Sequence, residues 1–415
     1  MDTDGIISRL QCERVLARYF RNSENILTSF LLTPLSNQLD GFIGEQYILK
    51  LQYENGKTPN ELTFFVKILN GSNRVMFEMS KEMKAFEKES FYYETLLPSM
   101  LIKRLDCDYV TRSYFCEPYM IVLENLGESG YRGSGKNVAL DFKHCTMCLK
   151  TLAKFHAEPI LYELYKSQEH GKPYKLTDDY GDVLEDYVMT KVGNGANKFM
   201  RCSIKGMLDL IELVPENGVS RSSFKKALQE ESNRLLGEEK YSQGFRSTII
   251  HCDLWSNNFL YQYDKRNEIE RCKIIDFQTV AYGPPAFDVM SFIQSNTRKS
   301  FRDKYQQKLL IYYYDTLSGL LEGKGFQASE ILSEQEFRKS SEYFSVPAKI
   351  RAIVDRAMTF IPDDKFNEAA QSEETFSRLL FEDRGKVIIE AYESDDKFKD
   401  LITEDILELR SMLSV

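Results

Sequence analysis

An acid, an amide and a second acid are spaced so that they could act together on a phosphate group. In the stretch HCDLWSNNFLYQYD, Asp253 is followed five residues later by Asn258, and the later stretch CKIIDFQ ends an apolar run with Asp276. Phosphoryl transfer from ATP needs an acid that takes the proton of the attacking hydroxyl and oxygen ligands that hold Mg²⁺ against the phosphates. The spacing therefore predicts Asp253 as the base, with Asn258 and Asp276 as metal ligands.

These three residues need a scaffold that brings them to one place. The segments NFLYQY and RCKIIDF lie on either side of the turn DKRN, and STIIH precedes the first acid. Short β-branched and aromatic runs around a polar turn predict strands that pair as a hairpin. Such a hairpin would bring both metal ligands to the same end of a cleft.

A lysine far upstream could hold the phosphates. Lys67 lies in the apolar strand candidate LTFFVKIL, although a lysine in a strand is commonly at an edge or extends its ammonium to solvent. It follows a glycine-bearing turn, with Gly41 and Gly44, and precedes a long helix, which is where a kinase places its phosphate-binding lysine. The two glycines do not match G-x-G-x-x-G, so they predict nucleotide contact only through their position.

A glutamate on that helix could hold the lysine. Residues 75–97 repeat apolar side chains at steps of three and four, which predicts one amphipathic helix closed by Pro98. Glu89 lies three residues after Phe86 and so shares the buried face. We favour Glu89 as the partner of Lys67, and Glu82, one heptad earlier, is the alternative.

The rest of the chain divides into two parts. An N-terminal helix at 5–21, a strand at ILTSFLL and a hairpin formed by EQYILKLQY and ELTFFVKIL make the first part β-rich. The GKT in that hairpin turn is no P-loop, because the motif needs a glycine where Leu51 stands. A polar, glycine-rich passage near residue 125 marks a boundary, and helices dominate afterwards. We predict an N-lobe at 1–123, a hinge at 124–131 and a C-lobe at 132–415.

Composition narrows the class of protein. The chain has 415 residues, 42% hydrophobic and 28% charged, with a net charge of −9, so a nucleic-acid partner is not expected. No signal peptide or membrane-spanning run is evident, which predicts a cytoplasmic protein with free cysteines. The segment HCTMC, with His144, Cys145 and Cys148, could suggest zinc, but helical core packing is the simpler interpretation. No obligate protein partner is evident.

Five segments form a distinctive set: HCDLWSNNFLY, KIIDFQTVAYGPPAFDV, LAKFHAE, FEKESFYYETLLP and VLENLGESGYR. Together they resemble the ecdysteroid kinase-like family of insects, which is related to choline kinases and aminoglycoside phosphotransferases. The resemblance covers nearly the whole chain. DFQ in place of DFG, and the absence of H-R-D and A-P-E, separate the sequence from protein kinases. Many relatives carry glycine after the histidine, where this chain has Cys252.

The resemblance implies an α+β, protein-kinase-like fold with two lobes, a small β-rich lobe with one long helix and a large, mainly helical one. It implies ATP and Mg²⁺ as cofactors and a small-molecule alcohol as acceptor, with ecdysteroids as the named substrate and xenobiotics as an alternative. The acceptor site should come from the helical lobe, including YFSVPAKIRAIV and the tail. A protein kinase and a non-catalytic, kinase-like scaffold are the competing functions.

The resemblance also assigns roles to individual residues. Asp253 would be the base, Asn258 and Asp276 the magnesium ligands, and Lys67 with Glu89 would hold the α- and β-phosphates. The backbone of Glu124, Asn125 and Leu126 would meet the adenine. His251 and Asp288 are expected to be latches that hold the catalytic loop.

Overall fold

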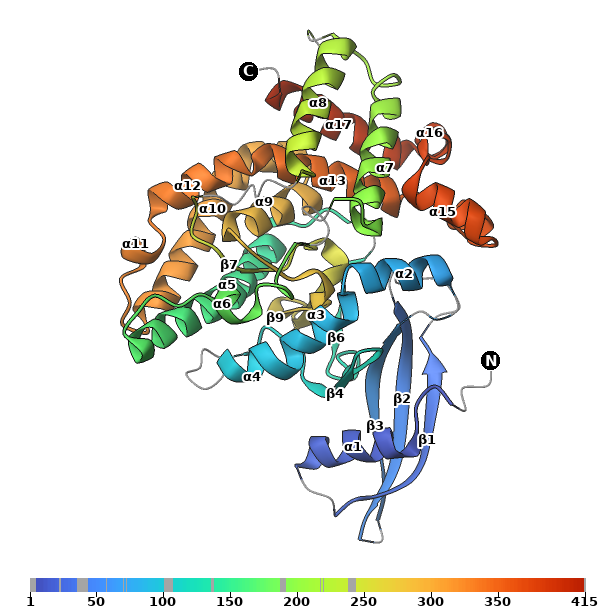
Figure 1. The fold of residues 1–415 in the computed structure, drawn as a ribbon, viewed down its shortest axis with the longest axis vertical. Helices are drawn as coiled ribbons and strands as arrows, with labels where there is room; N and C mark the ends of the chain where they lie inside the picture. The colour runs from blue at the N-terminus through green and yellow to red at the C-terminus, as the bar shows by residue number, and fades with distance from the viewer. Residues whose placement is uncertain are drawn as a thin grey trace.

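A β-rich lobe and a larger helical lobe make up the molecule in the computed structural model (Figure 1). The structure describes residues 5–21, 24–35, 44–56, 58–69, 71, 73–100, 107–135, 138–186, 192–216, 218, 220–237 and 244–413. Among these residues, no helix is both long enough and apolar enough to cross a membrane.

The first lobe is built on one antiparallel sheet, in which five described strands run in the order β1-β2-β3-β5-β4. The strands are β1 (Ile26–Pro34), β2 (Gly44–Asn55), β3 (Thr58–Leu69), β4 (Ser113–Glu117) and β5 (Met120–Glu124). Helix α1 (Arg9–Phe20) starts at a capping box on Ser8 and packs Cys12, Val15 and Leu16 into the apolar core of this lobe. The predicted hairpin is confirmed, because β2 and β3 pair from Gly44 with Leu69 to Asn55 with Thr58.

The predicted single helix over 75–97 is wrong. It consists of α2 (Arg74–Glu82), α3 (Ala85–Phe91), a π-helical turn η1 (Tyr92–Leu96) and α4 (Leu97–Met100). Lys84 interrupts it with φ = 55°, and its ammonium pairs with Asp182 of the helical lobe. The apolar periodicity of the sequence does not indicate this break. Pro98 does not close the helix, because the helical segment continues through it to Met100, and the π-helical turn η1 lies directly before α4.

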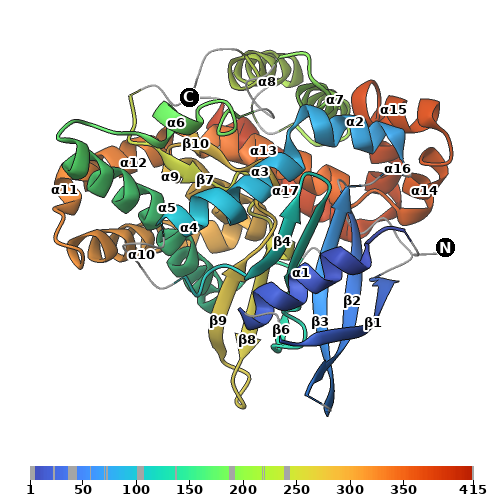
Figure 2. The same cartoon turned by 60° about the horizontal axis from the view of Figure 1, so that its bottom comes forward.

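The helical lobe begins after β6 (Tyr131–Arg132) with the long helix α5 (Phe142–His170), whose apolar side chains enter the main core. Smaller strands follow: β7 (Thr248–Ile250), β8 (Phe259–Tyr263), β9 (Ile269–Ile274) and β10 (Ala281–Gly283). The predicted hairpin of β8 and β9 is confirmed, and β6 pairs along its edge (Figure 2). A 3-10 turn, η3 (Ser256–Asn258), connects β7 to β8, and a second one, η4 (Phe277–Thr279), lies between β9 and β10.

Helices complete this lobe around α5. Their bounds are α6 (Leu176–Tyr180), α7 (Gly195–Leu210), α8 (Arg221–Leu235), α9 (Pro285–Asn296), α10 (Lys299–Glu322), α11 (Ala328–Ile331), α12 (Glu334–Tyr343), α13 (Ser345–Thr359), α14 (Asp363–Ala369), α15 (Glu373–Phe381), α16 (Gly385–Ser394) and α17 (Asp396–Met412). A β-sheet lobe joined to a helical lobe is the predicted protein-kinase-like architecture, which is confirmed.

Candidate active site

Lys67 lies in the middle of the N-lobe sheet rather than at an edge. It is opposite Gln46 on β2 and Ile121 on β5, and only 7% of the residue is exposed. Its Nζ donates to Glu89 Oε2 at 2.8 Å and to Asp276 Oδ1 at 2.6 Å. Burial by itself would lower the pKa of Lys67, but the carboxylates of Asp276 and Glu89 outweigh it and raise that pKa. The lysine is therefore a charged group held in place by acids from both lobes.

Of the two glutamates considered from the sequence, Glu89 is the one that contacts Lys67. Glu89 is 1% exposed, and its other oxygen, Oε1, accepts from the Phe277 backbone N–H at 3.3 Å. Glu82 instead accepts a hydrogen bond from the backbone N–H of Gly195 at the start of α7. Glu89 therefore joins α3, β3 and the segment after Asp276 at one point.

Gly44 lies against the lysine. A Cβ atom on Gly44 would lie 3.1 Å from Lys67 Cγ and 3.1 Å from the Ile68 carbonyl oxygen. A side chain there would crowd the lysine stem, so this glycine has a packing reason that its weak motif did not reveal. Gly41 lies outside the described residues.

The predicted catalytic loop, residues 251–258, is held in place by Asp288, a fully buried carboxylate in the first turn of α9. Its Oδ2 accepts from the His251 backbone N–H at 2.6 Å, and its Oδ1 accepts from the Cys252 backbone N–H at 3.0 Å. His156 of α5 also contacts Oδ2 through its Nε2 at 3.1 Å, while its Nδ1 lies 2.6 Å from the Tyr313 hydroxyl. A buried acid with several N–H donors fixes the loop backbone directly.

His251 connects the two halves of the loop. Its Nε2 lies 3.0 Å from the Ile275 carbonyl oxygen, and its Nδ1 accepts from the Asp253 backbone N–H at 3.3 Å. Burial lowers the pKa of His251, which favours the neutral ring with its proton on Nε2. The ring is thus an internal brace between the segments that carry the two acids.

Cys252 has a left-handed backbone, with φ = 65°. Glycine adopts this conformation at little cost, whereas other residues adopt it with strain. The geometry therefore gives a physical reason to expect glycine at this position. Cysteine here adds backbone strain without removing a reactive group.

Asp253 and Asn258 face each other across the loop. Asn258 Nδ2 donates to the Asp253 carbonyl oxygen at 2.8 Å and to Asp253 Oδ2 at 3.0 Å. Arg351 of α13 approaches the other carboxylate oxygen, with Nη2 3.6 Å from Oδ1. Burial raises the pKa of Asp253 to about 7, with Arg351 opposing the rise and Asp355 and Asp276 adding to it. An acid whose pKa lies near neutrality suits general-base work.

Asp276 lies two residues after the end of β9, and 27% of its side chain is exposed. Its backbone is left-handed, with φ = 70°. The residues on either side are held in place: the Ile275 N–H donates to the Asn258 carbonyl oxygen at 3.1 Å, and the Phe277 ring stacks on Tyr92 with ring centroids 4.0 Å apart. The Asn258 amide uses its nitrogen on Asp253, so its oxygen is available for a cation. One carboxylate and one amide oxygen are hard donors that fit Mg²⁺, which commonly takes few protein ligands together with phosphates and water.

The predicted hinge residues follow the last strand of the sheet. Glu124 ends β5 and accepts from the Ser129 hydroxyl at 3.0 Å, and Asn125 donates to the Thr63 hydroxyl at 2.8 Å. Leu126 is buried, and its carbonyl oxygen accepts from the Tyr131 N–H at 2.9 Å. The segment is therefore an ordered turn between the lobes.

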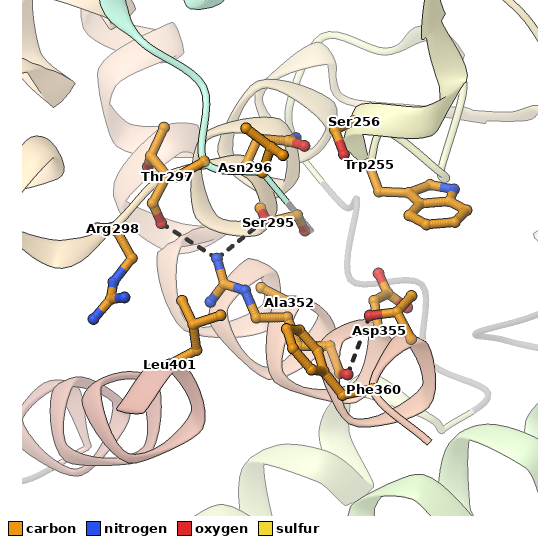
Figure 3. Close-up of a pocket in the computed structure, with 14 residues that line it drawn as sticks. Trp255, Ser256, Ser295, Asn296, Thr297, Arg298, Ala352, Asp355, Phe360 and Leu401 are labelled. Carbon is orange, nitrogen blue, oxygen red and sulfur yellow. Dashed lines mark hydrogen bonds between the residues drawn. The ribbon is translucent and has the colours of Figure 1, made fainter. Parts of the chain in front are cut away.

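A pocket opens beside the catalytic loop in the helical lobe (Figure 3). Its volume is about 50 Å³. Its lining comes from the catalytic loop, the end of α9, α13 and α17, and includes Trp255, Ala352, Asp355, Phe360 and Leu401. These elements include the segment YFSVPAKIRAIV and the tail, which the sequence indicated for the acceptor side.

Three site residues were not predicted from the sequence. Arg351 contacts Asp253 and is held by Asp355, which accepts from its Nε at 2.9 and 3.0 Å. Gln278 contacts Lys67 and Asp276. The spacing of Arg351 and Asp355, four residues apart on one helix, is a weak signal, whereas Gln278 was visible as the unusual last residue of DFQ.

The metal alternative at HCTMC is not supported by the contacts of His144. Its ring nitrogens lie 2.8 Å from Asp141 Oδ1 and 3.1 Å from the Tyr263 hydroxyl. Among the residues that the structure describes, no group of three or more His, Cys, Asp or Glu side chains could hold a metal ion. The cluster on α5 is consistent with core packing.

Comparison with known proteins identifies the family. The model of the ecdysteroid kinase-like family matches residues 38–326, more than half of the chain. An uncharacterized kinase-like protein of Caenorhabditis elegans is 28% identical over 243 residues, which are 55% of this chain and 56% of that protein. The 4-hydroxytryptamine kinase of Psilocybe cyanescens is 40% identical over 47 residues, 11% of this chain and 13% of the enzyme. The match thus spans about half the length of the first relative and a short part of the second.

Solved structures are similar at low sequence identity. The gentamicin complex of an aminoglycoside phosphotransferase, APH(2″)-IIa, is 12% identical, covers 96% of this chain and 98% of its own, and superposes with a TM-score of 0.42. The predicted family is confirmed, while an insect source is not shown by these matches. The chain belongs to the ecdysteroid kinase-like family.

Proposed function

We propose that this protein transfers the γ-phosphoryl group of ATP to a hydroxyl of an apolar small molecule, with an ecdysteroid or a similar hydroxylated ring compound as the favoured acceptor. The observation that carries the proposal is the convergence of Lys67, Glu89 and Asp276 within hydrogen-bonding distance, from two lobes and three elements. Buried charges are costly to assemble, so a buried lysine paired with a partly exposed acid supports a site for an anion.

The nucleotide would lie between the lobes. Lys67 would hold the α- and β-phosphates, and the backbone of Glu124, Asn125 and Leu126 would meet the adenine. Asp276 and the amide oxygen of Asn258 would hold Mg²⁺, which when bound offsets the negative charge of the phosphates. The predicted division into residues 1–123, 124–131 and 132–415 belongs to this proposal, with the hinge as the middle part.

Asp253 would act on the acceptor. One of its oxygens lies 3.0 Å from the amide nitrogen of Asn258, and Arg351 lies between it and Asp355, a residue of the pocket lining. As the acceptor oxygen forms its bond to the γ-phosphorus, the bond from that phosphorus to the bridging oxygen of ADP breaks, and the hydroxyl proton goes to the Asp253 carboxylate. A pKa of about 7 allows this carboxylate to take the proton near neutral pH.

The pocket supports an apolar acceptor over a cationic one. Its lining includes the rings of Trp255 and Phe360 and the aliphatic side chain of Leu401, and its carboxylate, Asp355, is already paired with Arg351. An ammonium group would have to compete with that arginine. Because about 50 Å³ is far below the volume of usual ligand pockets, only part of a ring system would enter, and the rest would extend into the cleft.

An acceptor panel tests the proposal. The full-length protein is incubated with radiolabelled ATP and Mg²⁺ and with ecdysteroids, other sterols, phenolic glycosides, choline and aminoglycosides. Faster turnover of a neutral ring compound than of any cation is the expected result, and faster turnover of phenolic glycosides than of ecdysteroids would favour a detoxifying kinase. Nucleotide binding without turnover across the panel would contradict catalysis and favour a kinase-like scaffold.

A further inference from the structure

The ammonium of Lys67 has no donor left for a phosphate in this structure. A lysine ammonium has three N–H bonds. Its acceptors are Glu89 Oε2 at 2.8 Å, Asp276 Oδ1 at 2.6 Å and Gln278 Oε1 at 2.9 Å. A nucleotide phosphate can therefore bind Lys67 only if one of these three acceptors moves away.

Exposure indicates which acceptor leaves. The side chain of Glu89 is 1% exposed and that of Asp276 is 27% exposed, and Gln278 as a residue is 8% exposed. Glu89 is also fixed by the Phe277 N–H. Asp276 is the outermost of the three and carries the charge that a cation would attract. It is the acceptor that can exchange the lysine for another positive partner.

Gln278 contacts both members of this exchange. Its Oε1 accepts from Lys67, and its Nε2 donates to Asp276 Oδ2 at 3.1 Å. A neutral amide can offer an acceptor to an ammonium and a donor to a carboxylate at the same time. A glutamate here could not donate to Asp276 and would repel it.

The position of Gln278 is fixed by its neighbours. It lies in the short turn η4, between Phe277, whose ring stacks on Tyr92, and Thr279, whose hydroxyl donates to the His251 carbonyl oxygen at 2.8 Å. The amide is therefore held against the lysine by packing on one side and by the catalytic loop on the other.

We propose that Gln278 is a positioning residue of the phosphate site, which together with Glu89 keeps the Lys67 ammonium in place while Asp276 releases it. One N–H of Lys67 then becomes free for a phosphate oxygen. The Gln278 amide keeps its hold on Asp276 Oδ2, so that Oδ1 turns to a new positive partner. This inference rests on the proposed function, because it assumes that the ligand of Lys67 is the phosphate chain of ATP.

The opposite interpretation gives the opposite result. If Gln278 merely occupied the place of a phosphate on Lys67, removing its side-chain amide would free a donor and tighten nucleotide binding. If it positions the ammonium, its removal loosens Lys67 and weakens binding. The direction of the change in ATP affinity separates the two.

The experiment measures ATP binding by calorimetry on the full-length protein, first in EDTA and then with Mg²⁺. Gln278→Leu keeps the approximate size and removes both polar contacts. We expect ATP binding in EDTA to weaken about tenfold or more, as for the loss of a hydrogen bond to a charged group. Gln294→Leu, at a buried glutamine of α9 in the helical lobe, is the matched control and should bind ATP like the wild type.

Gln278→Glu provides a second variant if the leucine disturbs folding, which the melting temperature without nucleotide reports. It should weaken ATP binding in EDTA as well, and Mg²⁺ should restore its binding more than it restores that of Gln278→Leu, because the added carboxylate attracts the cation. Unchanged or tighter ATP binding in both Gln278 variants would overturn the inference while leaving the proposed function standing. Failure of the wild type to bind ATP would overturn both.

Discussion

Lys88 offers a quantitative test of how the two lobes are joined next to the site. It is 2% exposed on α3, beside Glu89, and its ammonium donates to the carbonyl oxygens of Glu185 at 2.6 Å and Val280 at 2.7 Å. Burial lowers the pKa of Lys88 from 10.5 to about 8, although Asp186 and other nearby groups partly oppose this. The helix that carries Glu89 is thus joined to the helical lobe by a lysine whose charged form is destabilised by burial.

The sign and size of that cost follow from the pKa. Because the folded-state pKa is the lower one, the unfolded chain binds more protons between about pH 8 and 10.5, and stability rises with pH over that range. At ~1.4 kcal/mol per unit, the full effect is about 3 kcal/mol. We expect Lys88 to add about 1 kcal/mol of stability to the wild type between pH 7 and 9, and about 2 kcal/mol by pH 10. The tether persists, since a neutral amine retains two N–H donors for two carbonyls.

Urea denaturation at pH 7, 9 and 10 gives the free energy of unfolding of the wild type and of Lys88→Met. The difference between the two at each pH measures the contribution of Lys88, because the effects of other titrating groups cancel. Lys84→Met is the matched control, since Lys84 also joins the lobes but through Asp182, whose side chain is 78% exposed. That variant should follow the pH dependence of the wild type. A wild-type minus Lys88→Met difference that stays constant or falls from pH 7 to 10 would refute the reasoning.

Three further outcomes are expected. In calorimetry, Lys67→Ala should weaken ATP binding about tenfold or more, and Glu89→Ala should weaken it less. Glu82→Ala should leave ATP binding unchanged. Unchanged ATP binding in Glu89→Ala would contradict the assignment of Glu89 as the partner of Lys67. Asp288→Ala removes the acceptor of several buried N–H groups, each of which costs ~1–3 kcal/mol when left unpaired. Urea denaturation should therefore show that the free energy of unfolding falls by about 3 kcal/mol or more. A fall of less than about 1 kcal/mol would be inconsistent with a latch. Asp405→Ala removes the carboxylate that pairs with the buried charges of Lys349 and Arg356. Urea denaturation should show a loss of about 3–5 kcal/mol in the free energy of unfolding, whereas removal of a surface acid costs at most about 1 kcal/mol.

Local patterns in the sequence were sufficient for the strands and for the acid spacing. The alternation in β2 and β3 placed Lys67 on a strand, and the hairpin of β8 and β9 brings Asn258 close to the segment of Asp276, as expected from a turn between two β-rich runs. The helical face of Glu89 could also be read from its spacing to Phe86. These features depend on neighbours a few residues apart in the chain.

What could not be predicted depends on contacts between distant segments. The helix breaks at Lys84, which contacts Asp182, 98 residues away, and the apolar periodicity of the sequence gives no sign of either feature. Arg351 reaches Asp253 from a helix 98 positions later in the numbering, and nothing in the spacing of either residue indicates it. Gln278 was noticed as part of DFQ, but its role in holding Lys67 needs a fold that brings positions 67 and 278 together.

The most direct test of the proposed mechanism is the Asp253→Asn variant. Asparagine preserves the shape of the side chain and can still face Asn258 and Arg351, but it cannot take a proton, and a general base typically contributes ~10²–10⁴-fold to the rate. ATP binding measured by thermal shift should match that of the wild type, while turnover of the best acceptor should fall by about 10²-fold or more. Near-normal turnover with intact ATP binding would remove Asp253 from the chemistry and contradict the proposed mechanism.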